Sequence, residues 1–119
     1  MATIAYPGNL QTAQTGNADS TNVIRRGPII NNRSAVLRIV STIGATPTVT
    51  VNILGSYDGT TFFNIMYSPL AAAPTQFVNS AIVITTAITQ LFVLPDTDWV
   101  FLKINMSANT NVTLTSDVF

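Results

Sequence analysis

Residues 48–65, TVTVNILGSYDGTTFFNI, show the clearest β pattern of this chain. Val49, Val51 and Ile53 alternate with polar residues, and this period of two is typical of a half-buried β-strand. A second strand is expected over residues 61–67. Between the two strands, Asp58-Gly59 predicts a hairpin turn, because glycine readily adopts the positive φ that a type I′ or bulged turn requires.

The chain on either side of this hairpin continues the β pattern from residue 35 onward. Strands are expected at residues 35–42, 47–55, 61–67, 78–86, 88–94, 99–106 and 112–118. Turn residues separate these segments, and none of them predicts a helix. Short strands at this spacing are typical of an all-β, antiparallel β-sandwich or barrel, here expected to be jelly-roll-like. Residues 99–106 carry apolar side chains on both faces, which favours contact with a second chain.

Residues 1–34 have a different character, rich in Gln, Thr, Asn, Gly and Ala and without a sustained period. Gly27-Pro28 is expected to interrupt any regular element. A structureless stretch of this length is unusual inside a compact domain. We therefore expect an extended N-terminal arm over residues 1–34, which orders on a partner, and a β-sandwich domain over residues 35–119.

The composition argues for association with other protein chains. Charged residues make up 8% of the 119 residues, against about 25% in an average domain, and the formal net charge is zero. A surface with so little charge tends to associate. The balance of acidic and basic residues argues against nucleic acid as a partner. No apolar run is long enough for a membrane span, and no secretory signal is expected, so synthesis in the cytoplasm is predicted.

The residue types also argue against an enzyme. The chain has no His, Glu or Cys, so the common acid–base groups, nucleophilic triads and zinc sites cannot form. Asp96 and Asp98 are the only close carboxylate pair, and their place beside Pro95 favours a plain turn. No catalytic residue, cofactor or metal site is therefore expected.

One cluster of side chains in the arm is a candidate docking site. Three of the five basic residues, Arg25, Arg26 and Arg33, lie within nine positions, with Ile29 and Ile30 between them. Arginine binds carboxylates through two parallel hydrogen bonds, so the cluster predicts docking on an acidic protein surface. The alternative interpretation is a solvated loop.

The run GSYDGTTF at residues 55–62, after a strand of alternating valines, resembles a recurring pattern in small β-sandwich proteins of tailed phages. Residues 99–104, WVFLKI, and the chain end Asp117-Val118-Phe119 are similar to the closing strands of those proteins. Among them, capsid decoration (cement) proteins are closest in size. The resemblance implies a homotrimer on the outside of the virion capsid, with the major capsid protein as partner and the arm clamping neighbouring subunits.

Two alternatives to a decoration protein remain at this point. Small neck, tail and head-fibre proteins of phages share these traits. The S-x-D-G-T-aromatic turn also occurs in discoidin-like modules, which would make the chain a carbohydrate- or receptor-binding β-sandwich. That function predicts exposed aromatic side chains, with Trp99 and Tyr57 as the first candidates. The simpler interpretation places most aromatic residues in the core.

Overall fold

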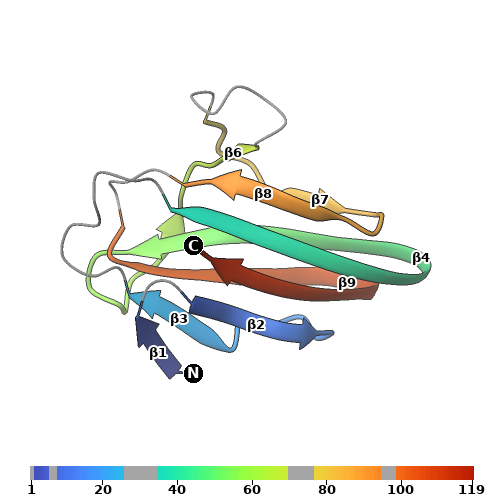
Figure 1. Ribbon diagram of the computed structural model, residues 1–119, viewed down its shortest axis with the longest axis horizontal. Coiled ribbons are helices and arrows are strands. Elements are labelled where there is room, and N and C mark those ends of the chain that lie inside the picture. The colour runs from blue at the N-terminus through green and yellow to red at the C-terminus, as the bar shows by residue number, and fades with distance from the viewer. Residues whose placement is uncertain (1, 6–7, 26–34, 70–76, 95–98) are drawn as a thin grey trace.

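Two long strands, β4 (Val36–Ser56) and β9 (Phe101–Val118), form the centre of the fold (Figure 1). The computed structural model describes residues 2–5, 8–25, 35–69, 77–94 and 99–119. Within these ranges every regular element is a strand, which confirms the predicted all-β class. The same ranges contain no helix that could cross a membrane. β4 and β9 pair antiparallel along their whole length, from Leu37 opposite Val118 to Ser56 opposite Phe101.

Both central strands fold back on themselves at one end of the molecule, which we name the bend (Figure 1, right). The register of the pair shifts there, and Thr46, Ala108 and Asn111 adopt positive φ. Side-chain amides close the bend, since Asn109 Nδ2 donates to the Thr15 carbonyl at 2.8 Å and Asn111 Nδ2 to the Ala45 carbonyl at 2.7 Å. The single sheet therefore curls into two facing layers, in agreement with the predicted sandwich or barrel.

The remaining strands flank β4 and β9 in both layers. On the β9 side lie β1 (Ala2–Ala5), β2 (Gly8–Gln14) and β3 (Asn22–Arg25). On the β4 side lie β5 (Phe63–Asn64), β6 (Ser68–Pro69), β7 (Ile82–Ile84) and β8 (Thr89–Val93). β2 and β8 join the front layer, which contains the first half of β4 and the second half of β9. β3, β5 and β7 join the back layer, formed by the other halves.

The core lies between the two layers and follows the alternation in the sequence. Each half of β4 and β9 turns every second residue inward, and these side chains are almost completely buried. They include Leu37, Ile39, Val49, Val51, Ile53, Leu102, Ile104, Met106, Leu114 and Val118. Along the first half of β9, Phe101, Lys103 and Asn105 face outward and are half-buried. The apolar set of residues 99–106 is thus divided between core and surface.

The described residues of the predicted arm differ from the expectation, because they belong to the sheet. β2 and β3 pair with β9, and β1 pairs in parallel with β3. Leu10 and Ile24 are completely buried in the core. The prediction that the arm leaves the domain is therefore wrong for residues 2–5 and 8–25. Residues 26–34 lie outside the described residues.

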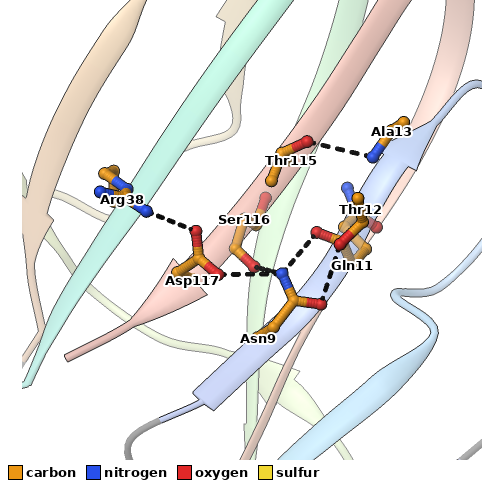
Figure 2. A network of polar contacts seen from close by, with 8 residues as sticks. All are labelled: Asn9, Gln11, Thr12, Ala13, Arg38, Thr115, Ser116 and Asp117. Carbon is orange, nitrogen blue, oxygen red and sulfur yellow. Dashed lines mark hydrogen bonds and ion pairs between the residues drawn. The ribbon is translucent and has the colours of Figure 1, made fainter.

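A network of polar contacts holds β2 on the front layer (Figure 2). Asn9 Nδ2 donates to Asp117 Oδ1 at 2.9 Å and to the Gln11 carbonyl at 3.0 Å. Asp117 Oδ2 in turn accepts a hydrogen bond from Arg38 on β4 at 2.9 Å. The register of β2 shifts on both sides of Gln11. These irregularities break the period of two, which explains why residues 8–14 show no strand pattern in the sequence.

Candidate functional site

The end of the molecule opposite the bend gathers the ends of several strands (Figure 1, left). Arg25 at the end of β3 and Ser56 at the end of β4 both lie opposite Phe101 at the start of β9. In the front layer, Val36 and Phe119 exchange backbone hydrogen bonds of 3.0 and 2.9 Å. We name this region the open end.

The loop after β4 is held rigidly at the open end. The buried Ser56 hydroxyl accepts hydrogen bonds from the backbone N–H groups of Asp58 (3.2 Å) and Gly59 (2.9 Å). The Asp58 carboxylate accepts from the N–H groups of Thr61 (2.9 Å) and Thr60 (2.8 Å), and these hydrogen bonds lower the pKa of Asp58. Gly59 has φ of +79°, as the hairpin prediction required.

This rigid loop presents an aromatic side chain to solvent. Tyr57 is 63% exposed, and its ring centroid lies 5.6 Å from that of Phe63, which is 36% exposed. A Cβ atom on Gly59 would lie 3.3 Å from the Phe101 ring, so the loop lies directly against that ring. These contacts define the loop conformation that places Tyr57 at the surface.

Of the predicted docking cluster, Arg25 is the member that the structure describes. Its side chain is exposed, and its guanidinium carbon lies 5.9 Å from the centroid of the Phe101 ring. Arg26, Ile29, Ile30 and Arg33 lie outside the described residues. The chain enters this segment after Arg25 and leaves it before Ala35, whose carbonyl accepts a 2.9 Å hydrogen bond from Leu94 N. Both attachment points lie at the open end.

Most of the charged side chains that the structure describes form ion pairs with each other. Arg38 pairs with Asp117 at 2.9 Å, and Lys103 pairs with Asp19 at 2.8 Å. The hydrogen bond from Lys103, together with one from Asn105, lowers the pKa of Asp19. Among the charged side chains that the structure describes, Arg25 and Asp58 are the two outside an ion pair. Both of them lie at the open end.

The sequence prediction for the aromatic residues is partly confirmed. Trp99 and Tyr67 are buried, so Trp99 cannot form the exposed binding platform that a carbohydrate-binding module would need. Tyr57, the other candidate, is exposed. Phe63, expected in the core, lies at the surface beside it. The signal that could have located Tyr57 is its place immediately before Asp58-Gly59, because a residue in a hairpin loop faces solvent.

The described residues also include no group of three or more side chains of the types that commonly bind metal ions. Asp96 and Asp98 lie outside those residues. The open end thus carries an exposed tyrosine, together with an arginine and a carboxylate that form no ion pair among the described residues. Comparison with known proteins found no matching family model, no similar curated protein and no similar solved structure.

Proposed function

We propose that this chain is a structural protein of a tailed-phage virion, which binds the outside of the capsid as a decoration (cement) protein. The observation that carries the proposal is the open end, where the exposed side chains of Tyr57, Arg25 and Asp58 lie at the same end of the molecule as both attachment points of residues 26–34. Tyrosine and arginine are enriched among the residues that dominate the free energy of protein–protein binding. The resemblance of residues 55–62 and 99–104 to phage β-sandwich proteins supplies the class of partner, the major capsid protein.

The proposed mechanism is mechanical. The open end and the segment 26–34 contact neighbouring capsid subunits, with the arginines opposite acidic side chains. Because the site exists only on the assembled shell, binding stabilises the shell by mass action. If several copies of the chain are joined, the binding of one open end to the shell raises the effective concentration of the other open ends there. A weak individual contact then gives strong overall binding.

A face of the front layer is suited to joining copies of the chain. Val36 and Val40 on β4 point outward beside Leu91 and Val93 on β8, and all four are half-buried. Next to them, Arg38 and Asp117 neutralise each other, so two copies of this face meet without charge repulsion. We name these four residues the association face. It lies along the side of the molecule, so three copies, the number that the resemblance implies, can direct their open ends toward one shell.

Binding to phage heads tests the proposal. Heads of the phage that encodes the chain, assembled without it, are mixed with the purified protein and sedimented. The wild-type protein is expected to sediment with the heads. The double variant Arg25→Ala/Tyr57→Ala is expected to lose at least about tenfold in affinity, because exposed anchor residues of this kind often contribute that much.

The matched control is Ile43→Ala, which removes a comparably exposed apolar side chain near the bend. This variant is expected to bind the heads as the wild type does. Equal binding of the heads by the double variant and the wild type would contradict docking through the open end. Failure of the wild type to bind heads would sink the decoration function.

A further inference from the structure

A small polar depression lies in the back layer, between two short strands that pair with β4 at different positions. β5 pairs with Leu54 and Gly55, and β7 pairs with residues 49–51. Between them, the Ile65 N–H donates a 3.0 Å hydrogen bond to the Ile53 carbonyl. The depression above this point has a volume of about 180 Å³ and is lined by Asn52, Asn64, Asn79 and Ser80.

The asparagine side chains of the described ranges divide into two groups. Six form hydrogen bonds within the chain: Asn9, Asn17, Asn22, Asn105, Asn109 and Asn111. The other three in those ranges are Asn52, Asn64 and Asn79, for which no side-chain hydrogen bond is found. All three line the depression. The amides that the fold does not use are thus concentrated at one place.

We infer that this depression is a binding site for a single neutral sugar residue. Each carboxamide offers two donors and one acceptor, which matches the hydroxyl groups of a sugar ring. The Ser80 hydroxyl shares a 3.3 Å hydrogen bond with the Tyr67 hydroxyl and has further hydrogen-bonding capacity for the sugar. No charged side chain lines the depression, so an anionic or cationic ligand would have no partner there. The small volume fits one ring rather than a drug-sized ligand.

A peptide strand is a poorer fit than a sugar. Strand addition requires free backbone groups along a sheet edge. At the depression the Ile53 carbonyl already accepts a hydrogen bond from Ile65. β5 and β7 pair with the same edge of β4 before and after this point, and β9 pairs with the other edge. The groups that remain available to a ligand are the side-chain amides of the three asparagines, which are half-exposed or exposed to solvent. The depression lies next to the open end, since Asn64 follows Phe63 on β5, but the inference does not rest on capsid docking.

Chemical-shift titration of the ¹⁵N-labelled protein tests the inference. The probes are the methyl glycosides of glucose, galactose, mannose and N-acetylglucosamine, each added up to tens of millimolar. At least one of them is expected to give saturable shifts at the backbone amides of residues 52–54, 64–66 and 79–81. The double variant Asn64→Ala/Asn79→Ala is expected to weaken that binding by at least about tenfold, since two hydrogen-bonding groups are lost.

Both substituted residues are exposed and make no side-chain hydrogen bond in the described chain, so the variant is expected to fold normally. Its urea midpoint checks this directly. Thr89→Ala, at an exposed position of β8 in the other layer, is the control and is expected to bind as the wild type does. The inference is overturned by the absence of saturable shifts at these amides with all four probes, or by equal affinity of the double variant.

Discussion

Gly59 occupies a position in the loop after β4 that excludes a side chain for two reasons. Its φ is +79°, and a Cβ atom would lie 3.3 Å from the Phe101 ring. Gly59→Ala is therefore expected to lower the free energy of unfolding by about 1–2 kcal/mol. Urea denaturation followed by circular dichroism measures the change.

Gly16 is the matched control for this substitution. No heavy atom lies within 4 Å of a Cβ built on Gly16, and its φ is not positive. Gly16→Ala is expected to change the free energy of unfolding by less than about 0.5 kcal/mol. Equal effects of the two substitutions would contradict the described loop geometry.

Among the strands, β1, β2 and β3 are the ones that the sequence assigned to an arm and that belong to the sheet. Leu10 on β2 is completely buried in the core. Leu10→Ala is expected to lower the free energy of unfolding by about 2–5 kcal/mol, because it leaves a cavity beside β9. Chemical denaturation measures this effect.

Thr12→Ala, at an exposed position of the same strand, serves as the control and is expected to change stability by less than about 1 kcal/mol. A free arm would tolerate both substitutions equally, so that result would contradict the sheet position of β2. For the same reason, deletion of residues 2–33 is expected to unfold the domain rather than release an intact sandwich.

The sequence predicted most clearly the strands whose apolar and polar residues alternate. Val49, Val51 and Ile53 mark the second half of β4, and Gly59 marks the turn after it. The place of the bend was predicted, because it falls in the gaps between the expected strands 35–42 and 47–55 and between 99–106 and 112–118. The positive φ of Thr46 and Ala108 was not predicted, since few residues of these types adopt it. The expected strands 61–67 and 78–86 are reduced to β5 and β7, since the chain crosses from one layer to the other between them.

The candidate site was predicted only in part, for a related reason. The arginine cluster was visible in the sequence, and Arg25 lies at the open end. The neighbourhood of Arg25, Tyr57 and Phe63 depends on long-range pairing through Phe101, which no local pattern encodes. The depression with Asn52, Asn64 and Asn79 is likewise formed by strands far apart in the sequence.

For the whole molecule, stability is expected to be constant from about pH 5 to pH 7.5, because the chain has no His or Glu to titrate there. Hydrogen bonds hold the pKa values of Asp19 and Asp58 below 3.8. Burial opposes ionisation of Asp117, but hydrogen bonds from Arg38 and Asn9 outweigh it and lower that pKa also.

A carboxyl group with a lowered pKa in the folded state stabilises the fold above its unfolded pKa, and this contribution is lost as the pH falls through the folded pKa. The urea midpoint is therefore expected to fall below about pH 4, and less steeply in Asp19→Asn. A midpoint that rises between pH 5 and pH 3 would contradict this assignment.

The association face predicts the state of the protein in solution. The native mass is expected to be three times the 12.7 kDa of one chain. Leu91→Glu is expected to give a monomer, because it places a charge within the association face. Thr113→Glu, on the polar part of the same layer, is expected to keep the trimer. A Leu91→Glu variant that stays trimeric would place the contact elsewhere.

Electron cryomicroscopy of phage heads with bound protein would show whether the chain docks on the shell through its open end. We expect added density on the outer surface of the shell, with the loop of Tyr57 and the end of β3 against the capsid subunits and the bend pointing away. Density with the bend against the shell would contradict docking through the open end. Saturating protein without added density on the head would contradict the decoration function itself.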